Sequence, residues 1–392
     1  MRQQVEGDGD EEEQRLLVRA GTDLEVTIGC QDVSLTVGEG DAEFCALSNV
    51  TACLASGELC GILGPSGAGK TSFLNVVGGR ALATKGDLRV NGQEMSTLKN
   101  WESHCGFVAQ SDHLPAYLTV EEYFEFCCNL RCHGLQQSSR KKMVDSVIKQ
   151  LSLEKVCRKR TRIGSDVDKK LSGGEIRRVS IGAELLRADQ VRALLLDEPL
   201  SGLDSQSALQ IIDVLKSIAE EGRVVALSLH QPSSLLFSKL SKIILLDKTG
   251  RVCFFGTPGE AQTYFDETSM DHSSLVAVND DDAKGDQDGA QPIKMSIPEV
   301  MLDVASNASD STISVSSMSK NFWDSQIGKC RIEEVNAALC TSRSTLDDVL
   351  KDQRGDPCCC LCCARSDVGP FAVQVRALAV RAMRRHWRNG LM

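Results

Sequence analysis

The chain has 392 residues, 42% hydrophobic and 25% charged, an ordinary composition for a globular protein of two or three domains. Its formal net charge of −10 argues against a general nucleic-acid binder, because neutralising phosphates requires clustered Lys and Arg. The acidic residues concentrate in runs at 8–13 and 280–282, which indicate solvated tails or loops.

The 17 cysteines are expected to be thiols in a reducing, cytosolic compartment, because no secretory signal is visible. No run of 18 apolar residues occurs, so the chain as given is not expected to cross a membrane. The densest group of cysteines, at 358–363, leaves three interpretations open: palmitoylation beside a membrane, metal binding, or no function. Its position before a basic helix favours palmitoylation, and its unbroken spacing is poor for a metal site.

Segments with strand patterns recur along the chain, at 24–37, 44–54, 59–63, 86–91, 193–196, 224–229, 243–246 and an edge strand at 252–255. Helical patterns alternate with them, after Lys70, over 119–153 and over 205–221. Thr119 is expected to cap the second of these helices. The alternation predicts an α/β fold with a mainly parallel sheet, an initial hairpin and a helical insertion at about 112–165.

One stretch dominates the chemistry: Gly64-Pro65-Ser66-Gly67-Ala68-Gly69-Lys70-Thr71, called the phosphate loop below. It follows an apolar strand and precedes a helix, so its backbone N–H groups and the helix N-terminus can close around a triphosphate. Lys70 is expected to reach the β and γ phosphates, and the Thr71 hydroxyl to bind Mg²⁺. The alternative interpretation is a glycine-rich turn with a stray lysine, and the eight-residue pattern between a strand and a helix favours the nucleotide site.

Four further features lie elsewhere in the chain. Asp197 and Glu198 end an apolar strand, where Asp197 can hold Mg²⁺ and Glu198 can act as general base toward water. A second glycine-rich turn, Leu171-Ser172-Gly173-Gly174-Glu175, opens another helix and offers a second anion site, although an ordinary helix start fits it equally. Gln110 and His230 each end a strand, and neither signals a function alone.

Taken in order, these motifs, with Ser201-Gly202-Leu203-Asp204, resemble the nucleotide-binding domain of ABC transporters over about residues 24–265. The resemblance implies a P-loop NTPase with a RecA-like core, an antiparallel β subdomain and an inserted helical subdomain at about 112–190. It implies ATP and Mg²⁺ as cofactors and two such domains meeting head to tail. Each ATP would lie between one phosphate loop and the other domain's Ser172, Gly173 and Gly174.

The resemblance also assigns individual roles. Gln110 would sense Mg²⁺ and nucleotide, as a metal ligand and catalytic residue that communicates with a membrane domain. His230 would be the switch at the γ-phosphate, and Asp204 a contact across the dimer. The expected assembly is membrane-associated, with the ATPase domain on the cytoplasmic face, a transmembrane domain in cis or trans, and no nucleic acid.

Several segments resemble the G (White-type) subfamily in particular: 67–71, 118–122, 175–182, 230–234 and 297–306. In that subfamily the ATPase domain precedes six transmembrane helices, which implies that this chain is truncated before them and suggests a lipid, sterol or other hydrophobic cargo. The basic, amphipathic pattern at 371–392 is similar to the helix that lies under the membrane before the first span. An ordinary basic surface helix is the alternative for that pattern.

The expected organisation is therefore an acidic disordered N-terminus (1–22), the ATPase domain (23–266), a flexible acidic and Ser-rich segment (267–320) with a packed stretch at 297–304, a linker holding the cysteine group (321–370), and the basic helix (371–392). Two departures from the family pattern stand out. Val37 occupies the position where an aromatic residue often stacks on adenine, and the 267–294 insertion has no family role. Rival interpretations are a soluble ABC-type ATPase and a non-catalytic regulatory fragment.

Overall fold

The protein is described by a computed structural model, which places residues 25–38, 43–98, 101–132, 135–164, 170–186, 191–271, 296–307 and 315–340. The predictions made for 1–22, the cysteine group at 358–363 and the basic helix at 371–392 lie outside these residues. Most of the 267–294 insertion lies outside them as well.

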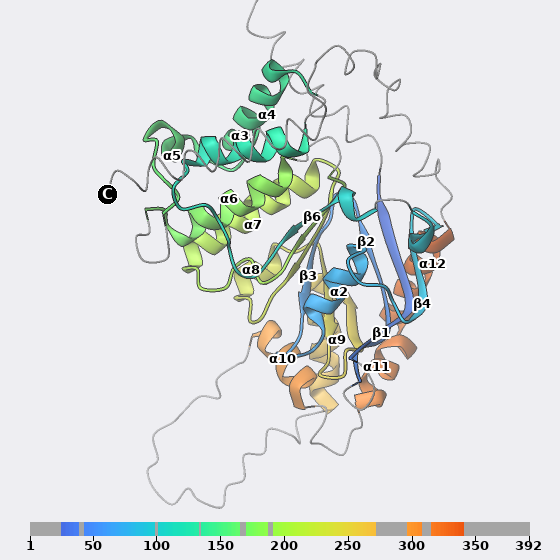
Figure 1. Cartoon of the computed structure of the whole chain (residues 1–392). Coiled ribbons are helices and arrows are strands. Elements are labelled where there is room, and N and C mark those ends of the chain that lie inside the picture. The colour runs from blue at the N-terminus through green and yellow to red at the C-terminus, as the bar shows by residue number, and fades with distance from the viewer. Residues whose placement is uncertain are drawn as a thin grey trace, which may run out of the picture.

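The core is a six-stranded sheet in the order β10-β9-β3-β8-β7-β6 (Figure 1). Its strands are β3 (Leu59–Leu63), β6 (Cys105–Val108), β7 (Ala193–Leu196), β8 (Val224–Ser228), β9 (Lys242–Leu246) and β10 (Val252–Gly256). All neighbouring pairs are parallel except β9 with β10, which is antiparallel and lies at the edge. The predicted mainly parallel sheet, with an edge strand at its end, is confirmed.

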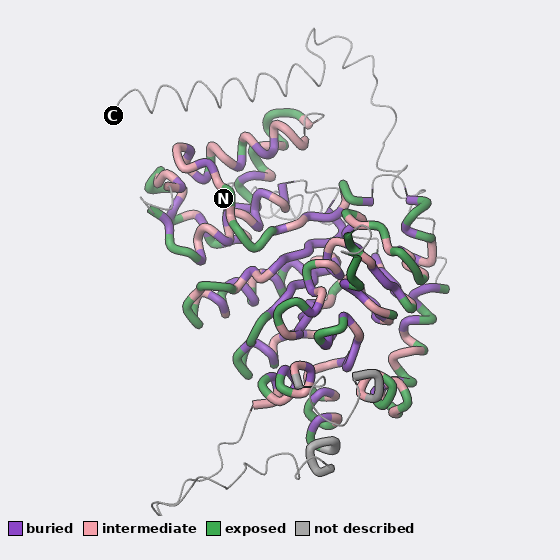
Figure 2. The backbone as a smooth tube through the Cα atoms, turned by 60° about the horizontal axis from the view of Figure 1, so that its bottom comes forward, coloured by how far each residue is buried: buried purple, intermediate pink, exposed green. Residues whose placement is uncertain are grey.

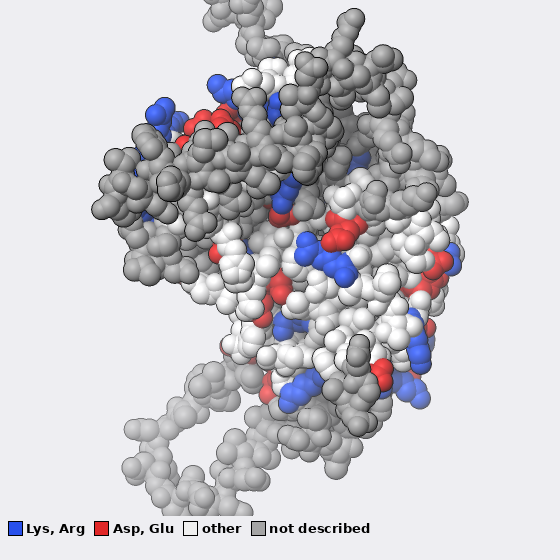
Figure 3. All heavy atoms as spheres, in the orientation of Figure 1, with Lys and Arg blue, Asp and Glu red and all other residues white. Residues whose placement is uncertain are grey.

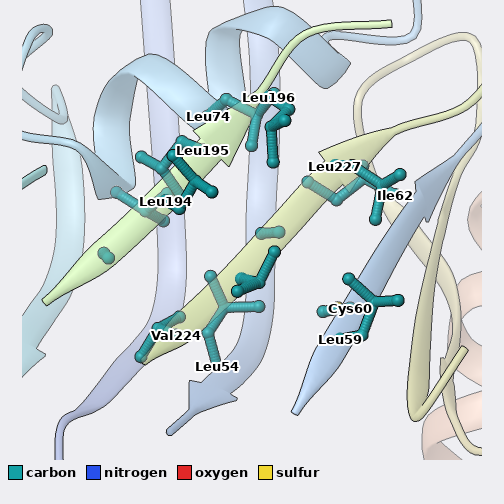
Figure 4. Packing of buried hydrophobic residues seen from close by; sticks show 14 of the residues in the cluster. Leu54, Leu59, Cys60, Ile62, Leu74, Leu194, Leu195, Leu196, Val224 and Leu227 are labelled. Carbon is teal, nitrogen blue, oxygen red and sulfur yellow. The ribbon is translucent and has the colours of Figure 1, made fainter. Parts of the chain in front are cut away.

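Apolar side chains cover both faces of this sheet. Every residue of β3, β7, β8, β9 and β10 is buried, as continuous apolar strands between two layers require. Figure 4 shows the leucines of β7 beside Leu227 of β8 and Ile62 of β3, with Leu74 of the helix α2 (Lys70–Val77) packed on them. Because parallel strands end at one edge, the loops after β3, β6, β7 and β8 all emerge there.

A second, antiparallel sheet has the order β2-β1-β4-β5 and stands beside the core (Figure 1). It consists of β1 (Thr27–Val37), β2 (Phe44–Ala55), β4 (Lys85–Val90) and β5 (Gln93–Glu94). Asn91 and Gly92 connect β4 to β5 with φ values of 50° and 77°, the left-handed pair that a two-residue hairpin turn needs. The short helices η2 (Met95–Thr97) and η3 (Trp101–His104) lead back to β6.

Helices fill the segment between β6 and β7. They are α3 (Val120–Arg131), α4 (Gln137–Gln150), α5 (Glu154–Arg158) and α6 (Gly173–Leu185), and they lie together on one side of the molecule with α7 (Ser205–Glu220) below them (Figure 1). Thr119 caps α3 through a capping box with Glu122. The short helix α8 (Ser234–Ser238) follows β8.

The C-terminal part of the described chain consists of helices. α9 (Pro258–Asp271) continues past 266, and α10 (Ile297–Asn307), α11 (Val315–Asp324) and α12 (Gln326–Cys340) are helical. α12 packs on β1, β2 and β4 through the buried Val335, Ala338 and Leu339. These three share one face at i, i+3 and i+4, but polar residues separate them in the sequence, which conceals the stripe.

Burial follows this layering. In Figure 2 the strands form a buried band through the molecule, and exposed residues lie along the outer sides of the helices. On the face shown in Figure 3, the described Lys and Arg side chains lie among Asp and Glu side chains. None of the helices within the described ranges is both long and apolar enough to cross a membrane.

Candidate nucleotide site

The phosphate loop joins β3 to α2 and can be built only with glycine at its tight points. Gly64 and Gly69 have φ values of 153° and 86°. A Cβ at Gly64 would lie 2.6 Å from the Leu246 carbonyl oxygen, and one at Gly69 would lie 2.3 Å from the Ala46 carbonyl oxygen. The loop is therefore held between β9 on one side and β2 on the other, with its backbone pressed against both strands.

Lys70 begins α2 and turns its side chain back over this loop. Its Nζ donates hydrogen bonds to the carbonyl oxygens of Gly64 (2.8 Å) and Pro65 (3.0 Å), and the residue is buried. Burial lowers the pKa of Lys70, while the nearby Glu198 and Asp197 carboxylates act in the opposite direction. Among the described residues, the ammonium group therefore donates to backbone carbonyls, and a phosphate oxygen would be a stronger acceptor.

A chain of hydrogen bonds connects the phosphate loop to the ends of three core strands. Thr71 Oγ1 donates to Asp197 Oδ2 (2.8 Å), and Ser228 Oγ donates to Asp197 Oδ1 (2.7 Å). The backbone N–H of Glu198 donates to Ser228 Oγ (2.7 Å), and Gln110 Nε2 donates to Glu198 Oε2 (2.8 Å). The structure therefore brings together Thr71, Gln110, Asp197 and Glu198, which lie far apart in the sequence.

Glu198 holds an uncommon backbone conformation. Its φ is 43°, in the left-handed region that non-glycine residues seldom adopt. Such strain costs about 1–3 kcal/mol and persists where the surroundings impose it. The bond from its N–H to Ser228 and the bond from Ser201 N–H to its carbonyl (3.2 Å) impose it here. The carboxylate is therefore fixed in direction as well as position, half-buried beside the phosphate loop.

The second glycine-rich segment forms the N-terminus of α6, as predicted, but it is self-capped and largely exposed. Ser172 accepts from the Glu175 N–H (3.2 Å), while Glu175 Oε2 accepts from the Ser172 N–H (2.8 Å). Ser172 and Gly173 are exposed. A Cβ at Gly174 would lie 3.1 Å from the Ser207 Cβ, so this segment packs on the start of α7 and not on the phosphate loop.

Asp204 and His230 lie at the ends of their own elements. Asp204 caps α7, where its carboxylate accepts from the Ser207 N–H (3.0 Å), and hydrogen bonds from Ser207 lower its pKa. Its side chain faces solvent. His230 is exposed just after β8, next to Leu229, whose N–H donates to Ile62 of β3 (2.9 Å). Among the described residues, neither Asp204 nor His230 takes part in the chain of hydrogen bonds around Asp197.

Arg177 connects α6 to the strand end that carries Gln110. Its guanidinium donates to the carbonyl oxygens of Ala109 and Gln110 (both 2.7 Å) and pairs with Asp112 (3.1 Å). Only 4% of the residue is exposed, and burial lowers its pKa. The helix that begins with Ser172 is thereby joined to the Gln110 backbone by a buried cation.

An apolar pair lies at the position where the resemblance places the adenine contact. Val37 and Phe44 face each other across the β1–β2 hairpin and are 41% and 60% exposed, which is unusual for large apolar side chains in this fold. Phe44 lies two residues before Ala46, whose carbonyl touches the phosphate loop at Gly69. An aromatic face is therefore available on the neighbouring strand although position 37 lacks one.

Sequence reasoning missed Ser228, Arg177 and Phe44. The available signal for Ser228 was a single hydroxyl after four apolar residues of β8, which places a polar group at the edge of the sheet where the site lies. The signal for Phe44 was its place opposite Val37 in the predicted hairpin. Arg177 gave no signal, because a basic residue in the first turns of a helix is ordinarily solvated.

A family model described as ABC transporter matches residues 47–201, a range that includes the phosphate loop, Gln110, the second glycine segment and Glu198. The chain carries an ABC transporter ATPase domain. It is 37% identical over 267 residues to ABC transporter G family member 26 of Arabidopsis thaliana, covering 68% of this chain and 38% of that protein. It is 40% identical to G family member 22 of the same plant, covering 59% of this chain and 30% of that protein.

The ATPase domain is also similar to a solved ATP-binding cassette, described as a dimer in a post-hydrolysis state bound to ADP and Pi. That similarity has 26% identity and a TM-score of 0.49, and it covers 59% of this chain and 98% of the other. The nucleotide-binding resemblance seen in the sequence is confirmed by the family match. The chain spans less than two fifths of the length of these two G-family relatives.

Proposed function

We propose that this chain binds and hydrolyses ATP to drive transmembrane transport, as the nucleotide-binding domain of a G-type ABC transporter. The observation that carries the proposal is the hydrogen-bonded chain Thr71–Asp197–Ser228–Glu198–Gln110 beside the phosphate loop. In this chain, two oxygen donors that would suit Mg²⁺ and a carboxylate with a constrained backbone lie next to a buried ammonium. The likeness to G-family relatives supports the transport role, and a lipid, sterol or other hydrophobic cargo is the corresponding proposal.

The donor atoms beside Lys70 suit a magnesium ion. Thr71 Oγ1 and Asp197 Oδ2 lie 2.8 Å apart, and Mg²⁺ prefers oxygen ligands from one or two protein groups together with phosphate oxygens. Thr71 and Asp197 would hold the ion, with Gln110 as a further ligand from the neighbouring strand. When bound with nucleotide, the ion supplies positive charge that offsets the developing charge on the phosphates.

Each residue then has a task in hydrolysis. Lys70 and the loop N–H groups bind the β and γ phosphates and stabilise charge on the transferred group. Glu198 accepts a proton from water as its oxygen attacks the γ-phosphorus, while the bond to the ADP oxygen breaks and inorganic phosphate leaves. The imposed backbone at Glu198 keeps that carboxylate aimed at one point. His230, exposed after β8 at the same edge of the sheet as the phosphate loop, would contact the γ-phosphate.

The exposed second glycine segment supports a head-to-tail pair of such domains. Ser172 and Gly173 at the N-terminus of α6 are exposed to solvent, whereas Gly174 is buried against Ser207 at the start of α7. A second ATPase domain could place its phosphate loop against them, with Asp204 contacting across the interface. The partner would be a second copy or a related domain, each working with a transmembrane domain at the cytoplasmic face of a membrane.

Glu198→Gln tests the catalytic assignment. The amide keeps the side-chain size and still accepts the Gln110 hydrogen bond, but it cannot take a proton from water. We expect turnover to fall by about 10²–10⁴-fold, the usual share of a general base, while ATP still binds and accumulates in a dimer. ATPase rate, nucleotide binding and sedimentation are the measurements, with the exposed Glu102→Gln as matched control. Hydrolysis at the wild-type rate in Glu198→Gln would show that the base is wrongly assigned.

A further inference from the structure

Three sulfur atoms meet between α3 and α4, away from the nucleotide site. Cys128 lies in the last turn of α3, Cys132 follows four residues later as the C-cap of that helix, and Met143 lies on α4. Met143 Sδ lies 4.0 Å from Cys128 Sγ and 4.0 Å from Cys132 Sγ. The two thiols also contact each other by a hydrogen bond. Neither cysteine takes part in a disulfide.

The two separations that involve Met143 match those of a trigonal metal site. Metal–sulfur bonds are about 2.3 Å long in structural thiolate sites, so three sulfurs around one ion form a triangle with edges of about 4.0 Å. Both measured edges equal this value without movement of either helix. Packing alone does not require the sulfurs to converge, because Met is flexible and can occupy many other rotamers.

We propose that Cys128, Cys132 and Met143 bind a soft monovalent metal ion, with Cu(I) as the chemical class. Two thiolates and a neutral thioether are the donors that Cu(I) accepts at low coordination number. Zinc would need a fourth ligand and takes His or carboxylate more readily than thioether. Within the described residues, no group of three or more His, Cys, Asp or Glu side chains is placed to hold a metal ion.

The surroundings provide access and a counter-charge. Cys128 is 1% exposed, whereas Cys132 and Met143 are half-buried, so an ion can reach the triangle from their side. Binding one Cu(I) forms two Cu–thiolate bonds and releases two thiol protons to water. The resulting site carries a net charge of −1. The hydrogen bond with Cys132 and burial raise the pKa of Cys128, and Arg140 on α4 acts in the opposite direction. The buried Nε of Arg140 has no hydrogen-bond partner among the described atoms, so this guanidinium can offset part of that charge.

Loading would also change a contact with α6. Cys132 Sγ now donates to the Leu186 carbonyl oxygen (3.1 Å), directly after the helix that begins with Ser172. Deprotonation removes that bond and replaces it with a metal bond to α4. The ion would therefore link α3 to α4, and the hydrogen bond between Cys132 and Leu186, at the end of α6, would be lost. This proposal does not depend on ATP hydrolysis or transport.

The test is anaerobic titration of the full chain with Cu(I) against a competing chromophoric chelator. The cysteine group at 358–363 would also bind copper, so Cys358, Cys359, Cys360, Cys362 and Cys363 are first replaced by Ser in the parent. We expect Cys128→Ser to weaken the binding of one equivalent by about a hundredfold or more, since even indirect partners of metals contribute 10- to 100-fold. Cys157→Ser, a half-buried cysteine on α5, is the matched control.

Met143→Leu is expected to keep the folded packing, because it replaces one apolar side chain with another of similar volume. It therefore tests the metal site even if Cys128→Ser unfolds. We expect it to weaken the same equivalent and to change X-ray absorption from three sulfur neighbours at about 2.3 Å to two. Wild-type affinity in Met143→Leu, or equal loss in Cys157→Ser, would overturn the site.

Discussion

Two glycine-rich segments open helices in this domain, and they differ in how complete they are. The phosphate loop is clamped between β2 and β9, its Lys70 is buried, and Thr71 is bonded to Asp197. The segment at Ser172 is exposed and satisfies its own backbone through Glu175. Two glycine-rich helix starts thus differ: the first has a full set of local partners, and the second presents Ser172 and Gly173 to solvent. The comparison supports the proposal that the second segment serves a partner domain.

The largest expected effect comes from a negative charge introduced at Ser172, which tests whether the second segment contacts the nucleotide of another chain. In Ser172→Asp the carboxylate still caps α6, because Asp is as good an N-cap as Ser. It also repels a triphosphate brought by another chain, so we expect turnover to fall by about a hundredfold, as when one charge-stabilising donor is lost. Nucleotide binding to the separate chain, measured by fluorescence titration, is expected to stay unchanged.

Ser172→Thr is the control for that variant, because it keeps both the cap and the hydroxyl. Its turnover is expected to stay near that of the parent. If Ser172→Asp hydrolysed ATP normally in the dimer, the second segment would lie away from the phosphates. If it lost nucleotide binding as a separate chain, the segment would belong to the same site as Lys70.

A smaller effect is expected at the base end. Phe44 offers the aromatic face that Val37 lacks, so Phe44→Ala should raise the dissociation constant for ATP by about 2- to 13-fold, the value of one aromatic stack. Leu82→Ala, which removes another exposed apolar side chain, is the matched control. Isothermal titration with ATP and GTP measures both. Unchanged ATP affinity in Phe44→Ala would remove this residue from the base contact.

The parts of the fold with a local signal could be predicted. β3 and β7 begin and end where their apolar runs do, and the Thr119 capping box and the left-handed turn at Asn91 follow from residue type alone. α12 could not be predicted, because its buried face is three residues wide and depends on the space beside Gly29 of β1. There Leu339 occupies a gap that only the folded sheet defines.

The residues of the site also fall into a group that the sequence predicts and a group that only the folded structure defines. Motifs and their order placed Lys70, Thr71, Asp197 and Glu198 at one sheet edge, and the structure brings these four together. The bridge through Ser228 and the buried bond network of Arg177 depend on which strands become neighbours, which single residues do not signal. The positive φ of Glu198 likewise arises from contacts at both sides of that residue.

Mixing two inactive variants tests the central claim, that each ATP site is shared between two domains. Lys70→Ala removes the phosphate-binding ammonium, and Ser172→Asp blocks the partner segment. In a mixed head-to-tail dimer one site carries both defects and the other carries neither, so an equal mixture should recover about a quarter of the wild-type ATPase rate. A rate no higher than the average of the two variants alone would contradict a shared site.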